Sequence, residues 1–488
     1  MRIPVHIGLA LAAVFVAASP LAADTLKVPQ DFATIQEAVD AAAAGDTVIV
    51  GPGEYTENVV VVNGKDGLTI QGKGAAIIDA HVGDTINSGI QIQSSDVTIS
   101  RLTIRHAGNN GIQNADPDPK GSKPPIQTGI TIDRVTIINS VNAGIRLDSV
   151  ADVSIQGCTL IGCASGETAQ ASITIIATDN ATVTKTTVRN SNAAAMRFLE
   201  GSDSASVTKC TIDASEGSGV VIFGDNALVD GTRISNTDST MIYVEGNAAT
   251  VTKNTLQGGG FIGINVNSDG ATIEKNKIAA TTRDSIEVEG ADMRIAKNTC
   301  SGAGSAGIEA TGTNATLDGN KVTDATESGF QLVVSDSAIK KNQATGCGTA
   351  GHAGFYVEGD ANMIESNTAR DNVTSGFVVN GSNNTLFKNK AQDNADNGIL
   401  VDSAAVPADG DVQMDNTLDS NQVKGSGGEG LENYAVNTTI IKNKFSGNRL
   451  DVTNATSSGA SIIDGGSNSF STGGTDVEPE IRDDEMEE

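Results

Sequence analysis

The 488-residue chain contains no tryptophan, and aromatic residues make up only 3% of it. Such a composition suits a narrow core filled by Ile, Val, Leu and Ala. Its five cysteines are too few and too scattered for a disulfide framework, so we expect buried, unpaired thiols.

Lys and Arg number 32 against 60 Asp and Glu, a formal net charge of −28. That charge argues against nucleic acid and anionic membranes as partners. It also disfavours polyanionic glycans unless a cation such as Ca²⁺ intervenes.

Long apolar runs are also missing, so no transmembrane segment is predicted. The exception is a short run over residues 7–18, which follows Arg2 and precedes small residues up to Ala23. This order is typical of a cleaved secretory signal peptide. We therefore predict a signal peptide over residues 1–23 and a secreted or periplasmic protein.

What the chain does have is a period. An asparagine returns after 22 residues four times in succession, and then after 25, 22, 32 and 22 residues. The column consists of Asn254, Asn276, Asn298, Asn320, Asn342, Asn367, Asn389, Asn421 and Asn443. A fixed period in the low twenties indicates a repeat architecture in which each unit contacts its neighbours.

Each repeat reads as strand, turn, strand, turn, with alternating apolar residues such as Ile264 and Val266. No helical segment separates the strands, so βαβ units and leucine-rich repeats fit poorly. We predict an all-β fold, a single-stranded right-handed parallel β-helix with about 22 residues per coil. About 16 coils fit between Gly89 and Phe470, a rod on the order of 75 Å at the strand spacing.

The column has a physical meaning in such a rod. Side-chain amides one coil apart can hydrogen-bond to one another in a ladder, as stacked Asn residues do in cross-β structures. In earlier coils the same position is expected to hold Cys158, Thr186, Cys210 and Thr232.

The two ends of the rod differ from its middle. Residues 32–43 place Phe32, Ile35 and Val39 on one helical face, which predicts a short helix capping the open first coil. We divide the chain into a signal peptide (1–23), a cap with the first coils (24–88), β-helix repeats (89–470) and an acidic disordered tail (471–488).

The opening LKVPQDFATIQEAVDAAAAGDTVIVGPGEYTENVVV, with GLTIQGKG and VTISRLTIRHAGNNGI after it, resembles the right-handed β-helix proteins of the pectin-lyase-like superfamily. It is most similar to their NosD-like group. The resemblance covers nearly the whole chain and implies the fold rather than an activity. That superfamily contains lyases, galacturonases, esterases, epimerases and non-catalytic surface proteins.

The enzyme signatures of that superfamily are mostly missing. Residues 351–354 (GHAG) only approach the Gly-His-Gly element of galacturonases, and residues 217–224 (GSGVVIFG) lack the aspartate of pectin methylesterases. No DPHD element of the alginate epimerases is present, and no lyase-like block of Arg or Lys facing calcium ligands stands out. The NosD-like group implies copper delivery, but His81, His106 and His352 form no copper-binding cluster in the sequence.

One strand of each repeat is predicted to turn a row of tyrosine and glutamate outward. The row comprises Tyr243, Glu245, Asn265, Asn267, Glu287, Glu289, Glu309, Tyr356, Glu358, Glu432 and Tyr434. Lysines fall elsewhere, beside the asparagine column, at Lys253, Lys275, Lys297, Lys341, Lys388 and Lys442.

Two interpretations of this row stay open. Tyrosine rings stack on sugars and carboxylates bind hydroxyl groups or Ca²⁺, which predicts a ligand-binding face with Tyr243, Glu245, Glu287, Glu289, Glu309, Tyr356 and Glu358. Glu287 and Glu309 would then be the candidate catalytic pair, about 5 Å apart, as in retaining glycosidases. The alternative is a plain solvated strand face.

Two loops interrupt the period, over residues 107–128 and 402–415. The first carries Asp116 and Asp118; the second carries Asp409, Asp411 and Asp415, a composition suited to calcium without the EF-hand spacing. Either loop could equally be a plain surface excursion.

These observations predict a secreted polysaccharide-binding or cell-envelope scaffold module. The alternatives are a polysaccharide-degrading lyase or glycoside hydrolase, and a purely structural surface protein. Neither a specific ligand nor an oligomeric state follows from the sequence.

Overall fold

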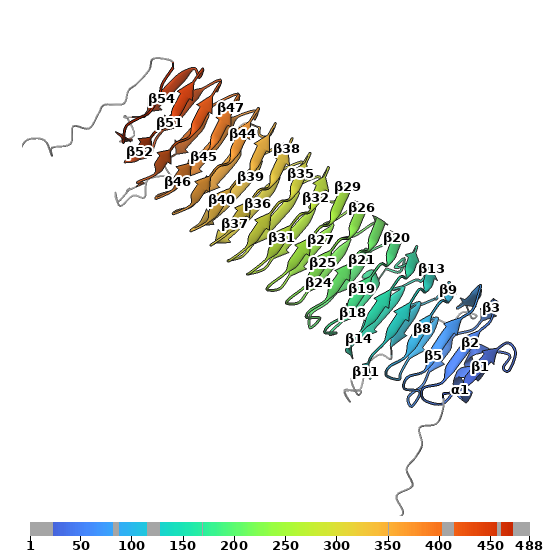
Figure 1. Ribbon diagram of the computed structural model, residues 1–488. Helices are drawn as coiled ribbons and strands as arrows, with labels where there is room; N and C mark the ends of the chain where they lie inside the picture. The colour runs from blue at the N-terminus through green and yellow to red at the C-terminus, as the bar shows by residue number, and fades with distance from the viewer. Residues whose placement is uncertain are drawn as a thin grey trace, which may run out of the picture.

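The computed structural model describes residues 23–81, 87–114, 127–167, 169–349, 351–402, 414–455 and 460–471. They form a straight rod of stacked coils that runs from the N-terminal to the C-terminal end (Figure 1). Each regular coil contributes one strand to each of three parallel sheets, A, B and C in chain order. The predicted parallel β-helix is therefore confirmed, with 16 strands of sheet C from β7 to β54.

The number of strands per coil was wrong, because each regular coil has three strands rather than two. Most strands of sheets A and B are three residues long, and only two residues separate β28 (Thr250–Thr252) from β29 (Thr255–Gly259). Alternation over so short a segment does not distinguish two strands from one.

Sheet A consists of β1 (Thr25–Val28), β2 (Thr47–Val50), β5 (Thr69–Gly72), β8 (Thr98–Ser100), β12 (Thr131–Asp133), β16 (Ser154–Gln156), β19 (Thr182–Thr184), β22 (Ser206–Thr208), β25 (Leu228–Asp230), β28, β31 (Thr272–Glu274), β34 (Arg294–Ala296), β37 (Thr316–Asp318), β40 (Ala338–Lys340), β43 (Met363–Glu365), β46 (Thr385–Phe387), β49 (Thr417–Asp419), β52 (Thr438–Ile441) and β55 (Ile462–Asp464).

Sheet B consists of β3 (Gly53–Thr56), β6 (Ala76–Asp79), β9 (Thr103–Arg105), β13 (Thr136–Ile138), β17 (Thr159–Ile161), β20 (Thr187–Ser191), β23 (Thr211–Ser215), β26 (Arg233–Thr237), β29, β32 (Lys277–Ala279), β35 (Thr299–Ser301), β38 (Lys321–Thr323), β41 (Gln343–Thr345), β44 (Thr368–Arg370), β47 (Lys390–Gln392), β50 (Gln422–Lys424) and β53 (Lys444–Ser446).

Sheet C consists of β4 (Val59–Val61), β7 (Ile90–Ile92), β10 (Ile112–Asn114), β14 (Ile145–Asp148), β18 (Ala171–Ile176), β21 (Ala194–Phe198), β24 (Val220–Phe223), β27 (Ile242–Glu245), β30 (Ile264–Asn267), β33 (Ile286–Glu289), β36 (Ile308–Thr313), β39 (Phe330–Ser335), β42 (Ala353–Glu358), β45 (Ser375–Asn380), β48 (Ile399–Asp402), β51 (Glu429–Asn433) and β54 (Leu450–Asn454). β11 (Gln127–Thr128) and β15 (Val150–Ala151) form a separate pair.

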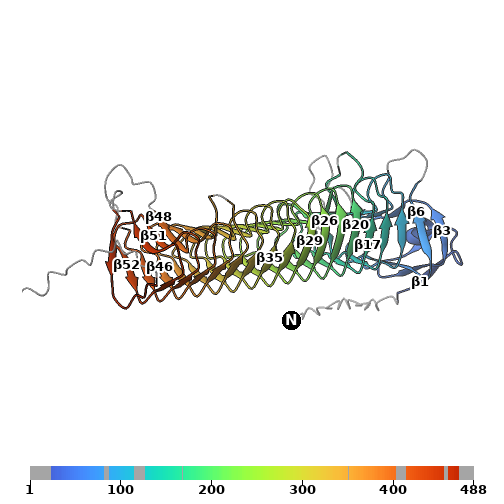
Figure 2. The same ribbon diagram turned by 90° about the horizontal axis from the view of Figure 1, so that it is seen from above.

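The core is a set of apolar columns parallel to the rod axis. Equivalent residues of successive coils pair in register, so that Ile264 lies between Ile242 and Ile286, and all three side chains are fully buried. Stacked rings replace these aliphatic residues further on, with centroids 4.5 Å apart for Phe330 and Phe355. Figure 2 shows the same stacking of coils from a second side.

The first strand residue of sheet C is often preceded by a glycine, for a steric reason. A Cβ atom at Gly307 would lie 2.2 Å from Val322 Cγ1 and 2.7 Å from the carbonyl oxygen of Gly329 in the next coil. Only glycine fits where the backbone comes this close to its neighbours.

A short helix covers the N-terminal end of the rod, as predicted. Helix α1 (Ile35–Ala41) begins with a capping box formed by Thr34 and Glu37, and it packs against β1, β2 and β4. Its buried residues include Ile35 and Val39. Within the described part of the chain, no helix is long and apolar enough to cross a membrane.

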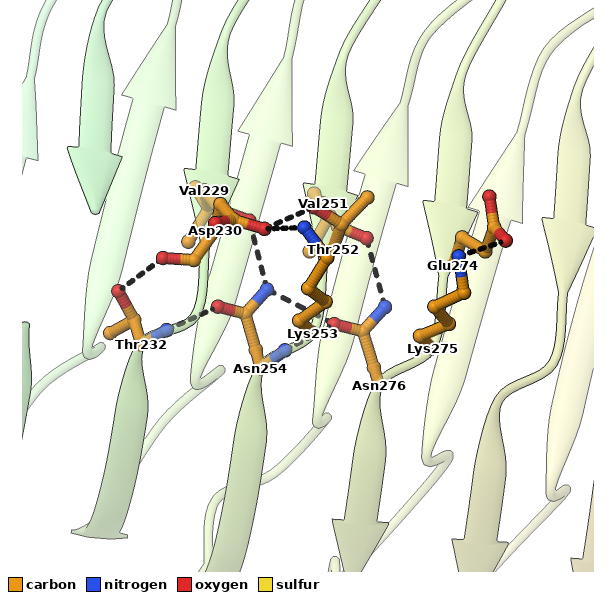
Figure 3. Close-up of polar contacts among 10 residues, drawn as sticks. All are labelled: Val229, Asp230, Thr232, Val251, Thr252, Lys253, Asn254, Glu274, Lys275 and Asn276. Carbon is orange, nitrogen blue, oxygen red and sulfur yellow. Dashed lines mark hydrogen bonds and ion pairs between the residues drawn. The ribbon is translucent and has the colours of Figure 1, made fainter. Parts of the chain in front are cut away.

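The asparagine column lies in the bend between sheets A and B, where it is fully buried. Asn254 Nδ2 donates hydrogen bonds to the Val229 carbonyl (2.9 Å) and to Asn276 Oδ1 (3.0 Å), and Asn276 Oδ1 also accepts the Asn254 backbone N–H (2.9 Å) (Figure 3). Each amide thus joins three successive coils. The pattern recurs at each later member of the column and ends on Asn468.

Candidate functional site

The outward side of sheet C carries the predicted tyrosine and glutamate row. In β27, Ile242 and Val244 are buried while Tyr243 is half-buried and Glu245 is exposed. The register places Tyr243, Asn265, Glu287 and Glu309 side by side on four successive coils. We call these four residues the mid-rod row.

Gln331, Tyr356, Val378, Leu400 and Glu432 continue the same line on later coils. Glu245, Asn267 and Glu289 form a second, more exposed line. Glu358 lies on that second line further along, opposite Val333. The apolar Val378 and Leu400 therefore separate Tyr356 from Glu432, and Tyr434 lies just beyond strand β51.

The two glutamates of the mid-rod row are poorly solvated. Burial raises the pKa of Glu287 and of Glu309, and the nearby carboxylate of Asp284 raises both further. Asp284 itself is fully buried, accepts the Ala306 N–H (2.9 Å) and pairs with Arg283 (3.1 Å). Glu287 Oε2 has no hydrogen-bond partner among the described residues. The Glu287 carboxyl group can therefore accept a hydrogen bond from a ligand.

Tyr243 and Tyr356 are each held in place by the glutamate two residues later, and Tyr434 by Glu432 two residues earlier. The Tyr243 hydroxyl donates to Glu245 Oε2 (2.8 Å), and the Tyr356 hydroxyl donates to Glu358 Oε2 (3.3 Å). Burial and the Glu245 carboxylate raise the pKa of Tyr243 to about 12, so this phenol stays protonated at neutral pH. Because their hydroxyl groups are already engaged, these tyrosines offer a ligand mainly their rings.

An aromatic and cationic pair at the adjoining bend was missed from the sequence. Phe261 lies just before β30 and is 48% exposed, and the Arg283 guanidinium lies 5.2 Å from the centre of its ring. Arg283 follows one coil later and also pairs with Asp284. An apolar ring after three glycines (Gly258–Gly260) was the signal that could have identified it.

The lysines lie along a different edge, beside the buried asparagine ladder. Lys253 and Lys275 adopt the left-handed conformation (φ 55° and 60°) that turns the chain through this bend. Lys253 Nζ lies 3.1 Å from Asp230 Oδ1, and Lys275 Nζ lies 2.9 Å from Glu274 Oε1 (Figure 3). Acidic residues at the last position of sheet A strands thus pair with these lysines.

The predicted calcium loop lies mostly outside the described residues, since these include Asp415 but not Asp409 or Asp411. Asp116 and Asp118 of the other loop are also outside them. Where the chain is described, no group of three or more His, Cys, Asp or Glu side chains is placed to hold a metal ion.

Comparison with known proteins assigns the family. The model of the family described as right handed beta helix region matches residues 126–270 and 262–412, more than half of the chain. The chain therefore belongs to this family.

One relative is a cell surface glycoprotein of Methanothermus fervidus, 36% identical over 121 residues. The match covers 24% of this chain and 18% of the relative, so the chain spans less than a fifth of the length of that protein.

Solved structures with a similar chain path include the tailspike protein of E. coli bacteriophage HK620 in complex with a pentasaccharide, at 12% identity and a TM-score of 0.42. That match covers 82% of this chain and 71% of the tailspike chain. Another is the periplasmic alginate epimerase AlgG, at 13% identity and a TM-score of 0.30, covering 82% of this chain and 78% of the epimerase.

Proposed function

We propose that this protein is a secreted or periplasmic β-helix module that binds polysaccharide along the outward side of sheet C. The observation that supports this function is the mid-rod row, in which Tyr243, Asn265, Glu287 and Glu309 stand in register on four successive coils. A row with one polar or aromatic side chain per coil suits an extended ligand lying along the axis.

The chemistry of the row suits sugar hydroxyl groups. Glu287 and Glu309 are half-buried acceptors, Asn265 offers both a donor and acceptors, and the rings of Tyr243 and Phe261 provide apolar surface. Since the chain carries a net charge of −28, a neutral polysaccharide is favoured over a polyanion unless Ca²⁺ bridges the two.

Two further observations support a position at the cell envelope. The first residues read as a signal peptide (1–23), and the relative from Methanothermus fervidus is named a cell surface glycoprotein. Within this proposal the chain is a NosD-like β-helix protein, residues 24–88 and 89–470 are its cap and repeats, and residues 471–488 form a solubilising acidic tail.

The test is co-elution of the mature protein with neutral and acidic polysaccharides in size-exclusion chromatography, with Ca²⁺ and with chelator. Binding should weaken roughly tenfold when Tyr243→Ala is combined with Phe261→Ala, because two stacking rings are lost. Phe387→Ala is the matched control, since Phe387 lies on the outward side of sheet A. Retention of full binding in the double variant would contradict the assignment of the site, and absence of binding across the panel would leave the scaffold function.

A second candidate function is hydrolysis or lyase chemistry at Glu287 and Glu309, which occupy adjacent coils. The raised pKa of each carboxyl supports an acid role. A retaining glycosidase, however, needs one carboxyl protonated and one ionised, and here burial and Asp284 shift both in the same direction. Shortened chains that disappear with Glu287→Gln would establish this function and replace the binding function.

A further inference from the structure

A separate cleft lies nearer the N-terminal end, where β10, β14 and β18 of sheet C meet the bends that precede them. Its volume is about 250 Å³, and its lining includes Asn109, Gln113, Asn142, Arg146 and Gln170. Arg146 is joined to Tyr243 by successive pairs through Thr174, Arg197 and Val221. The cleft and the mid-rod row are thus four coils apart, about 19 Å at the strand spacing.

The cleft lies beside coils that are longer than a regular coil. The side chains of Asn142 and Asn109 meet although 33 residues separate them, against 22 in a regular coil. The bend between β17 and β18 takes nine residues (162–170), whereas the bend between β29 and β30 takes four (260–263). Ala169 and Gln170, at the end of this longer bend, belong to the lining of the cleft.

The floor of the cleft is fixed by two buried asparagines. Asn110 is 3% exposed; its Oδ1 accepts the Ala143 N–H (2.9 Å), and its Nδ2 donates to Gln113 Oε1 (2.6 Å). Asn114 is 6% exposed; its Nδ2 donates to the Asp148 carbonyl (2.7 Å), and its Oδ1 accepts the Asp148 N–H (2.9 Å). The Gln113 side chain is therefore held with its oxygen engaged.

This arrangement leaves several polar atoms of the lining available. Asn142 Nδ2 donates to Asn109 Oδ1 (2.7 Å), so the Asn109 amide hydrogens and Asn142 Oδ1 remain. Within the described part of the chain, the Gln113 Nε2 and the side chain of Gln170 also have no hydrogen-bond partner. Primary amides present a donor beside an acceptor, the pattern that neighbouring sugar hydroxyl groups complement.

The charges and the size of the cleft restrict the ligand. Arg146 Nη2 lies 3.7 Å from Asp148 Oδ2, so the cation and the anion of the cleft balance one another. A volume of about 250 Å³ falls just below the roughly 300–1,000 Å³ of pockets for drug-sized ligands. The cleft therefore suits one or two neutral rings better than an anionic chain.

We infer that the cleft is a second saccharide subsite, which binds one or two rings of a neutral or N-acetylated sugar through the side chains of Gln113, Asn142, Arg146 and Gln170. The inference rests on the proposed function only in taking the ligand to be a glycan, because the two sites share no residue.

The experiment is saturation-transfer NMR of the mature protein with cellobiose, lactose and di-N-acetylchitobiose, together with galacturonate and glucuronate disaccharides. We expect a neutral disaccharide to bind, and Gln113→Ala combined with Arg146→Ala to weaken it roughly tenfold, the loss expected for one or two hydrogen bonds. Gln257→Ala combined with Arg233→Ala is the matched control, since both residues are exposed on sheet B. It should bind as the unaltered protein does.

The mid-rod variant Tyr243→Ala with Phe261→Ala separates the two proposals. Disaccharide binding that survives this variant but not the cleft variant supports the second subsite, whether or not long polysaccharides still co-elute. Binding lost in the mid-rod variant and kept in the cleft variant overturns the subsite and leaves the proposed function intact. Binding of uronates alone, or of no disaccharide in the panel, also overturns it.

Discussion

The coils before Asn254 and the coils from Asn254 onward are joined by different side chains at the bend between sheets A and B. In the earlier coils the bend between sheets A and B holds Cys158, Thr186, Cys210 and Thr232 in the column that asparagine occupies later. The Thr232 hydroxyl accepts a hydrogen bond from the Cys210 N–H (3.3 Å) and donates one to the Asp230 carbonyl of its own coil (3.5 Å). It links two coils, whereas each asparagine links three.

The two regions also differ in coil length, but the ladder is not the cause. The earlier coils vary, with 28 residues between Cys158 and Thr186 and 22 between Cys210 and Thr232. Yet the ladder continues across the 32-residue coil between Asn389 and Asn421, with an Nδ2–Oδ1 distance of 3.1 Å. The ladder therefore fixes one bend of each coil and leaves the other bends free to lengthen.

The largest expected difference between the regions follows from removing one column residue in each. Asn298→Ala leaves the Asn276 N–H and the Ile273 carbonyl without their partner and removes one of the two hydrogen bonds of Asn276 Nδ2, so we expect a loss of about 3 kcal/mol in the free energy of unfolding. Cys210→Ala should cost about 1 kcal/mol. Urea unfolding followed by circular dichroism measures both losses. Equal losses would show that the asparagine ladder stabilises the rod no more than the cysteine and threonine column of the earlier coils does.

The cysteines report which region opens first. All five are buried and unpaired, as expected from the sequence, and burial raises the pKa of Cys158 and Cys210 to about 11 and of Cys300 to about 12. Little thiolate is therefore available in the native protein at pH 8.

Below the urea midpoint we expect Cys158 and Cys210 to be alkylated roughly tenfold faster than Cys300, since local opening there breaks fewer hydrogen bonds. Pulsed alkylation with peptide mass spectrometry measures the order. Cys347, whose backbone N–H donates to Asn372 Oδ1, should be alkylated as slowly as Cys300. Simultaneous labelling of all sites would mean that the rod opens as one unit.

A smaller gain is expected from extending the ladder by one coil. Thr232→Asn places an amide beside Asn254, where it can accept the Cys210 N–H and donate to Asn254 Oδ1. Net hydrogen-bond contributions predict a stabilisation of about 0.5–1.5 kcal/mol, seen as a higher urea midpoint. The reverse substitution, Asn254→Thr, should lower the midpoint; a Thr232→Asn variant less stable than the parent would show that the earlier coils are shaped for smaller side chains.

The smallest effect concerns the mid-rod row. A raised pKa means that the folded protein holds the protons of Glu287 and Glu309 more tightly than the unfolded chain, so their contribution to stability is complete in acid and is lost as the pH rises through the folded pKa. Glu287→Gln with Glu309→Gln should therefore stabilise the rod at pH 7 by about 0.2–1 kcal/mol, and have little effect below the usual carboxyl pKa.

Glu216→Gln is the matched control for this double variant, because Glu216 is exposed at a bend between sheets B and C. Thermal unfolding at several pH values measures the difference. A gain that did not depend on pH would rule out like-charge repulsion and desolvation as its origin.

The sequence predicts best what repeats at a fixed spacing. The alternation of Ile264 and Val266 and the period of the asparagines are enough to predict the coil, its stacking direction and the buried face. Two shorter asparagine ladders were missed, one with Asn362 and Asn384 and one with Asn372 and Asn394. Each lies five residues before or after a member of the main column, so the spacing was visible in the sequence.

Sites that depend on irregular coils could not be predicted in the same way. The cleft around Gln113 and Arg146 lies among coils of unequal length, and unequal length removes the periodic signal that would align these residues. Phe261 follows three glycines, a signal that could have identified it, but nothing in the sequence identifies Arg283, one coil later, as its partner. The alignment of Glu287 with Glu309, in contrast, follows directly from the 22-residue spacing.

The direction of the backbone hydrogen bonds determines how the rod responds to force. These bonds join one coil to the next and so lie along the axis, which means that tension between the two ends of the rod opens them one coil at a time, like a zip. Each regular step frees 22 residues, or roughly 75 Å of extended chain. Under tension the protein should therefore lengthen coil by coil, in equal steps through the regular 22-residue coils and in longer steps at coils such as the one between Asn389 and Asn421.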